Sequence, residues 1–105
     1  MIVNVSGQKF RVSWKHEQRH GSLLGSHSGK KLPYTAVTTC RIFTMGENPS
    51  LVAEGEAFCS YRDNFCKDKG RKASLSDALR NAGMSKDVRS AFWYAYSDEI
   101  GLVNA

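Results

Sequence analysis

The sequence predicts an α+β fold: an antiparallel four-stranded sheet made of two hairpins and covered on one face by two C-terminal helices. Apolar and polar residues alternate over much of residues 2–60, and a helical periodicity replaces this alternation over residues 64–96. The chain has 105 residues, of which 41% are hydrophobic, so it can bury one core without disulfides or metal. We therefore expect a single domain over residues 1–105.

The first hairpin is expected over residues 2–15. The β-rich run IVNV precedes Ser6 and Gly7, which favour a turn, and apolar residues then alternate with basic and polar ones. This pattern gives the strand one apolar and one basic face. The residues expected to point inward are Phe10, Val12 and Trp14.

Residues 16–33 predict a flexible loop, because they contain three glycines, three serines and all three histidines of the chain. A loop of this length is usually either functional or disordered. The histidines lack the closely spaced ligand pairs of structural zinc sites, so no metal is expected. The cations Lys30 and Lys31 instead indicate a mobile basic flap that orders on a partner.

The second hairpin is expected from Tyr34 to Thr44 and from Leu51 to Ser60, on either side of the turn sequence GENPS. Pairing the apolar faces of the two strands places Arg41 opposite Glu54 or Glu56 on the outer face. A slip by one residue would bury these glutamates, so we expect the first register.

Small residues of this hairpin predict close packing. Gly55 indicates either a bulge or the close approach of another backbone, such as a crossing helix. Cys40 and Cys59 are expected to be core residues and near neighbours across the hairpin. Cys59 and Cys66 form C-x6-C, which is not a metal or redox spacing, so no cofactor and no catalytic residue is expected.

The first helix is expected over residues 64–82, with Asp63 as its N-cap and Gly83 as its C-terminal cap. Its apolar residues fall on two nearly opposite sides. We expect one helix with an irregularity at Gly70; the alternative is a break there and a restart at Ser74.

The second helix is expected over residues 86–96 and begins after Ser85. Trp93 and Tyr94 fall away from its apolar stripe, and Tyr96 lies at the edge of the stripe. Exposed aromatic residues near Arg89 fit a contact with a partner as well as packing under the C-terminal residues. The residues at core spacing are Val88, Ala91, Phe92 and Ala95.

The net charge of +5 and the pI near 9.3 favour acidic partners, and four cations gather at the start of the first helix. Asp68 interrupts this cluster, and the alternative is an ordinary solvated charged face. No apolar run is long enough to span a membrane, and the N-terminus has no secretory signal pattern. The candidate partner-binding residues are Lys30, Lys31, Lys67, Lys69, Arg71, Lys72, Arg89, Trp93 and Tyr94.

Four runs of the sequence, TTCRI, VAEGEAFC, DNFCKDKGRKASLSDAL and FWYAY, resemble a family of small bacteriophage and prophage proteins without an assigned activity. The resemblance covers roughly residues 34–96. It implies a phage accessory protein. Three cysteines, an odd number, do not indicate a disulfide framework, so we expect the cytoplasm of the bacterial host as its location. Such proteins include antagonists of host defence, among them anti-CRISPR proteins.

The order of strands and helices is also similar to the double-stranded-RNA-binding domain and to strand-annealing recombination proteins. The similarity rests on the segment Gly70 to Ala73, because lysines at a helix N-terminus contact phosphates in that domain. The hairpin at residues 2–15 and the sequence Ser74-Leu75-Ser76 depart from its pattern.

Two functions follow as hypotheses. The first is a non-enzymatic phage-type protein that binds and inhibits a host nucleic-acid-handling defence complex, either a protein or a ribonucleoprotein. The second is a basic module that contacts nucleic-acid phosphates directly. An enzyme is not expected, because the sequence has no phosphate-binding glycine loop and no pairing of a nucleophile with a base.

Overall fold

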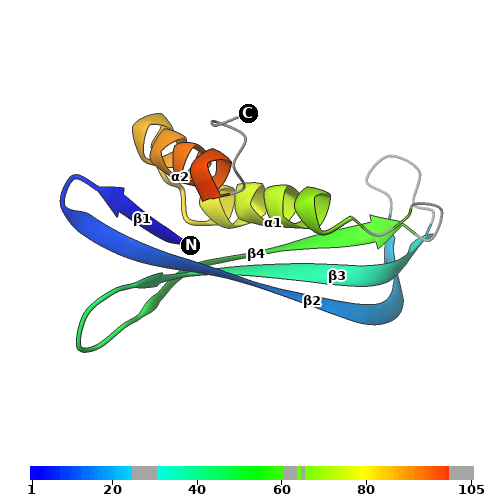
Figure 1. The fold of residues 1–105 in the computed structure, drawn as a ribbon. Coiled ribbons are helices and arrows are strands. Elements are labelled where there is room, and N and C mark those ends of the chain that lie inside the picture. Colours follow the sequence, from blue (N-terminus) through cyan, green and yellow to red (C-terminus); the bar gives the residue numbers. More distant parts are fainter. Residues whose placement is uncertain (25–30, 61–63, 65, 100–105) are drawn as a thin grey trace.

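The computed structural model, which describes residues 1–24, 31–60, 64 and 66–99, contains one antiparallel sheet and two helices (Figure 1). The strands lie in the order β1-β2-β3-β4, and both helices lie on the same side of the sheet. The predicted α+β fold is therefore confirmed. The elements are β1 (Ile2–Val5), β2 (Gln8–Leu24), β3 (Lys31–Thr44), β4 (Leu51–Ser60), α1 (Lys67–Asn81) and α2 (Lys86–Glu99).

A two-residue turn joins β1 to β2. Both of its residues have positive φ, 51° at Ser6 and 88° at Gly7, as the tightest hairpin turns require. The Gly7 N–H donates to the side chain of Asn4, with N and Oδ1 3.1 Å apart. The first hairpin thus forms where the sequence predicts it.

The prediction of a loop over residues 16–33 is wrong wherever the structure describes the segment. Residues 16–24 continue β2 and residues 31–33 begin β3; residues 25–30, including Lys30, lie outside the described residues. Pairing with a neighbouring strand overrides the weak strand preference of glycine, serine and histidine. Gly21 fits because a β-carbon there would collide with the Tyr34 hydroxyl.

The register of β3 against β4 confirms the predicted charge pair. Arg41 lies opposite Glu54, and its Nε donates to the Glu54 carboxylate at 2.7 Å. The same register shows that Cys40 and Cys59 are not neighbours, because Cys40 lies opposite Gly55 and Cys59 lies opposite Ala36.

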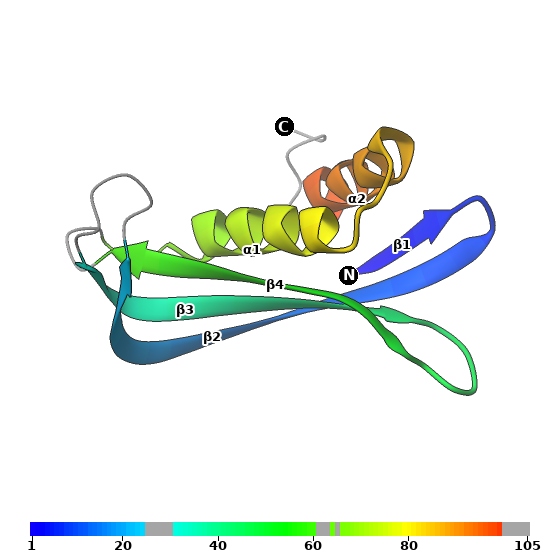
Figure 2. The ribbon, with the colours of Figure 1, turned by 180° about the vertical axis from the view of Figure 1, so that it is seen from behind.

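Helix α1 crosses directly over the sheet, covering β4 and β3 (Figure 2). A β-carbon at Gly55 would collide with the backbone of Ser74 and Ala78, which confirms the predicted close approach of a helix. A β-carbon at Gly70 would collide with Thr38 of β3. Glycine on both surfaces therefore lets the helix backbone lie against the strands.

The helix bounds differ partly from the prediction. Helix α1 is one helix and runs unbroken through Gly70, but it begins at Lys67 rather than residue 64, because Cys66 is still extended. Asp63, the predicted cap, lies outside the described residues. Gly83, with φ of 64°, ends the helix as predicted, and the N–H of Met84 donates to the carbonyl of Leu79.

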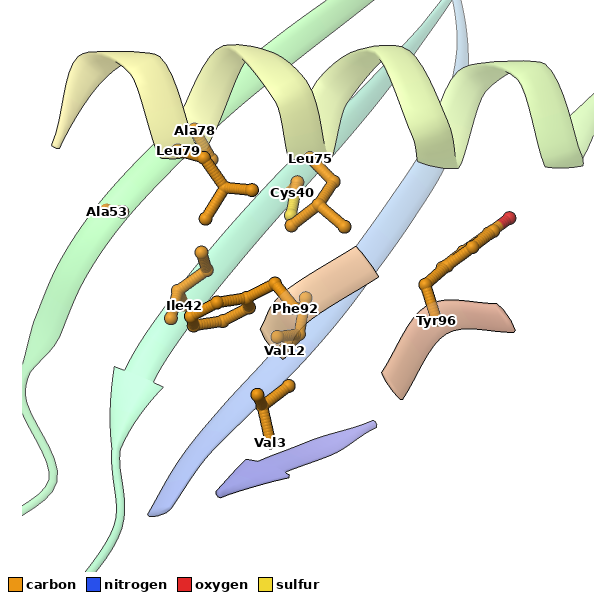
Figure 3. Packing of buried hydrophobic residues seen from close by; sticks show 10 residues of the cluster. All are labelled: Val3, Val12, Cys40, Ile42, Ala53, Leu75, Ala78, Leu79, Phe92 and Tyr96. Carbon is orange, nitrogen blue, oxygen red and sulfur yellow. The ribbon is translucent and has the colours of Figure 1, made fainter. Parts of the chain in front are cut away.

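The core lies between the sheet and the two helices (Figure 3). Phe92 of α2 is buried as predicted, but Tyr96 is also a core residue, with 2% of its surface exposed. Burial raises the pKa of Cys40 to about 12, so this thiol stays protonated. The core cluster consists of Val3, Val12, Cys40, Ile42, Ala53, Leu75, Ala78, Leu79, Phe92 and Tyr96.

Candidate interaction surfaces

The four cations at the start of α1 do not form one surface. Lys67, Lys69 and Lys72 are exposed and Arg71 is half-buried, but Arg71 and Lys72 both bond within the protein. Lys72 Nζ lies 3.0 Å from an oxygen of Asp68, and Arg71 Nε donates to the Tyr96 hydroxyl at 3.3 Å. Two of the four cations, Lys67 and Lys69, thus form no ion pair among the described residues.

Tyr96 completes this network by donating its hydroxyl to Asp68 at 2.5 Å. The pKa of Asp68 is lowered mainly by this hydrogen bond and next by the hydrogen bond from Lys72. The pKa of Tyr96 is raised mainly by burial and next by its hydrogen bond to Asp68. The carboxylate therefore stays charged and the phenol stays protonated at neutral pH. The Asp68 charge offsets part of the local positive potential.

Trp14 ties the same network to the sheet. Its Nε1 donates to the carbonyl oxygen of Arg71 at 3.2 Å, and its ring meets that of Tyr96 edge to face at 5.8 Å between centroids. Residues of β2, α1 and α2 therefore meet at one point. The Arg71 guanidinium and carbonyl join elements of the fold.

His16 lies on the helix-facing side of β2, where its Nδ1 is 2.8 Å from the Thr38 hydroxyl. Burial, followed by the charges of Arg71 and Lys67, lowers its pKa, so the ring is neutral at pH 7. Within the part of the chain that the structure describes, no three histidine, cysteine or acidic side chains are arranged to hold a metal.

A hollow of about 250 Å³ lies at the start of α1. Both Cys59 and Cys66 line it, together with Lys69 and Gly70. The Cys59 thiol donates to the carbonyl of Ser60, with S and O 3.6 Å apart.

A second hollow, of about 370 Å³, lies between the C-terminal end of α1 and the start of α2. Two arginines, Arg80 and Arg89, lie at this hollow together with the half-buried ring of Trp93. Arg80 bonds to Asp77 at 2.6 Å, whereas no ion pair among the described residues engages Arg89. The lining residues are Ser76, Leu79, Arg80, Gly83, Met84, Arg89 and Trp93.

The aromatic residues of α2 take three different positions. Tyr94 is 71% exposed and Tyr96 is buried. Trp93 is half-buried and packs edge to face on Tyr96, with 6.2 Å between the ring centroids. The structure thus brings Arg89 and Trp93 together as predicted and leaves Tyr94 outside the lining of the hollow. Arg80 and Met84 were missed, because they come from another helix and a turn.

The outer face of the sheet, away from the helices, carries a group of ion pairs that the sequence analysis did not predict, because it assigned Glu17 and Arg19 to a loop. Arg19 of β2 bridges Glu17 at 3.8 Å and Glu56 of β4 at 3.4 Å. The Arg19–Glu56 pair joins the strands on either side of β3, and Val37 of β3 is fully buried although neither α1 nor α2 covers this face (Figure 1). Long charged side chains can cover apolar surface in this way.

Arg11 and Lys31 lie on strands and do not line the hollow between α1 and α2. Arg11 lies over the ring of Phe43, 4.9 Å from its centroid. Lys31 begins β3, opposite Leu24.

Neither α1 nor α2 is long and apolar enough to cross a membrane.

Comparisons with models of known protein families, with curated proteins and with solved structures found no match to this chain.

Proposed function

We propose that this is a non-enzymatic, phage-type protein that binds an acidic surface of a host nucleic-acid-handling defence complex and blocks it. The binding site is the hollow between α1 and α2, where Arg80, Arg89 and Trp93 meet. The observation that carries the proposal is the exposed Arg89 beside the half-buried Trp93, both on α2 and both lining one hollow.

The composition of the hollow supports contact with a protein. Tryptophan, arginine and methionine are enriched at the centres of interfaces, and tryptophan and arginine dominate binding hot spots. Leu79 and Met84 add apolar lining. A partner of matching chemistry presents a carboxylate next to an apolar or aromatic side chain. Arg89 pairs with the carboxylate, and Trp93 packs against the neighbouring group.

The second candidate is direct binding of nucleic acid by Lys67 and Lys69. Their exposure in the first turn of α1 favours it, because a helix N-terminus attracts phosphate. Asp68 lies between them and keeps its negative charge. We therefore place this function second.

A capture experiment separates the two candidates. Tagged protein is incubated with bacterial lysate, with and without nuclease, and the bound proteins are identified by mass spectrometry. We expect a protein complex that survives nuclease treatment and is lost with Arg89→Glu. Arg89 is exposed, so this change should not disturb folding.

Lys86→Glu is the matched control, because it makes the same charge change on α2 outside the hollow. Once the target is known, Arg89→Ala should weaken binding by about 2 kcal/mol, the size of a hot-spot contribution. Capture that disappears with nuclease and with Lys67→Glu/Lys69→Glu, but not with Arg89→Glu, would establish direct nucleic-acid binding instead.

A further inference from the structure

Three cations follow one another along the outer face of β2. Val12 and Trp14 of this strand pack toward the helices. Side chains alternate along a strand, so Lys9, Arg11 and Lys15 lie on the opposite face, which neither α1 nor α2 covers (Figure 1). All three are exposed, and no ion pair among the described residues engages any of them. These three residues form a basic track.

The acidic residues of the strands are paired with other cations. Glu17 and Glu56 lie 3.8 and 3.4 Å from Arg19, and Glu54 accepts a hydrogen bond from Arg41 at 2.7 Å. Within the described part of the chain, the positive charge of the basic track is therefore not offset by an ion pair. An anionic partner would be attracted to this half of the outer face.

A row of residues crosses the basic track at Arg11. This arginine lies opposite Ile2 of β1 on one side and opposite Phe43 of β3 on the other. Its guanidinium lies over the Phe43 ring, 4.9 Å from the centroid, and Ile2 is 59% exposed. Guanidinium planes and aromatic rings are the groups on which unpaired nucleic-acid bases stack. The row thus offers a base both a stacking surface and an apolar contact.

We propose that this face of the sheet binds single-stranded nucleic acid. Phosphates contact the basic track, and a base stacks at Arg11 and Phe43. The inference does not depend on the proposed function, which uses the hollow between the helices on the other side of the sheet (Figure 1). It also concerns a different site from Lys67 and Lys69, which belong to α1.

The spacing of the basic track suits an extended polyanion. Alternate residues of a strand lie about 7 Å apart, so residues 9–15 span about 20 Å. A single strand can lie extended along this line and turn its bases toward the sheet, whereas a duplex keeps its bases paired and stacked. An acidic peptide would match the charge alone. The stacking surface at Arg11 favours a nucleic acid.

The test is fluorescence anisotropy of a labelled oligothymidylate of about 16 nucleotides, the upper end of the site sizes known for single-strand-binding folds. We expect the purified chain to bind it at about 50 mM salt and to bind more weakly as salt is added. The logarithm of the affinity should fall against the logarithm of the salt concentration with a slope of about −2, because each of three phosphate contacts contributes about −0.7.

Two variants separate charge from stacking. Lys9→Glu/Lys15→Glu should weaken binding about tenfold or more and bring the slope to about −0.7, because one phosphate contact remains. Arg11→Lys keeps the charge and loses the guanidinium plane, so it should weaken binding about fivefold and leave the slope unchanged.

Lys67→Glu/Lys69→Glu is the matched control, because it makes the same change of net charge on α1. It should keep the affinity within about twofold of that of the natural chain, since the screened effect of distant charges is small. Circular dichroism checks that every variant folds.

Four results would overturn the proposal. The first is no binding at low salt, and the second is an equal loss in the control and in Lys9→Glu/Lys15→Glu. The third is displacement of the oligonucleotide by polyglutamate as readily as by unlabelled oligothymidylate, which would assign the face to an acidic protein. The fourth is equal competition by a duplex, which would show that unpaired bases are not recognised.

Discussion

Arg71 of α1 and Arg89 of α2 are the same residue type in two different situations. The Arg71 guanidinium donates to Tyr96, and its carbonyl accepts from Trp14, so this residue connects three elements of the fold. Arg89 is exposed beside Trp93 and has no ion pair among the described residues. The comparison shows that a cation close to others in the sequence need not be available to a partner.

The two tyrosines of α2 show the same contrast. Tyr96 is buried and bonded to Asp68, whereas Tyr94, two residues earlier, is 71% exposed. Residues two apart on a helix point in very different directions, so one faces the core and the other faces solvent. Substitutions at these positions test whether the network around Tyr96 is structural.

Truncation of the two tyrosines should give the largest difference. Tyr96→Ala removes a buried aromatic ring and leaves a cavity, so we expect the free energy of unfolding to fall by about 3–5 kcal/mol. Tyr94→Ala should change it by less than about 0.5 kcal/mol. Urea denaturation followed by circular dichroism measures both. Similar losses at the two positions would show that the contrast is wrong.

Tyr96→Phe tests the hydroxyl alone. The ring contacts with Trp14 and Trp93 remain, but Asp68 loses a donor and Arg71 loses an acceptor. We expect a loss of about 1 kcal/mol, the typical net contribution of one hydrogen bond. The same denaturation experiment gives the value. An unchanged or increased stability would mean that the hydroxyl bonds do not hold the helices together.

Asp68→Asn should have a smaller effect, visible mainly as a change in pH dependence. The pKa of Asp68 is lowered on folding, first by Tyr96, so its charge stabilises the protein above the unfolded-state pKa of about 4. That stabilisation is lost as the pH falls through the lower folded-state pKa.

Denaturation at several acidic pH values measures this dependence. The natural chain should lose more stability below about pH 4 than Asp68→Asn does. Asp87→Asn removes an exposed carboxylate of α2 that forms no ion pair within the described part of the chain, and serves as the control. Equal acid sensitivity of Asp68→Asn and the natural chain would contradict the prediction.

Much of the fold could be predicted because local and non-local signals agree. The alternation in β3 and β4, together with Arg41 and Glu54, specifies a register that a slip would violate. Gly55 and Gly83 occupy positions where a side chain would meet backbone or strain φ. The extension of β2 through residues 16–24 could not be predicted, because its stability comes from pairing with β3 rather than from its own composition.

The candidate sites were less predictable. Tyr96 lies four residues after Phe92, a spacing that does indicate a shared face, but its bonds to Asp68 and Arg71 join residues 25 to 28 positions apart. No periodicity reveals such a contact. The hollow beside α2 likewise combines Arg80 of α1 with Arg89 of α2, and this depends on the angle between two helices.

The hydrogen bonds between α1 and the edge of β4 also bear on aggregation. A chain with two open edges could add a neighbour on each side and grow without end into a fibre. Asp77 accepts from the Glu56 N–H and Asn81 donates to the Glu54 carbonyl, so a strand added at the middle of β4 would first have to displace these two hydrogen bonds. Two short side chains on α1 therefore make the middle of this edge unfavourable for pairing with a second chain.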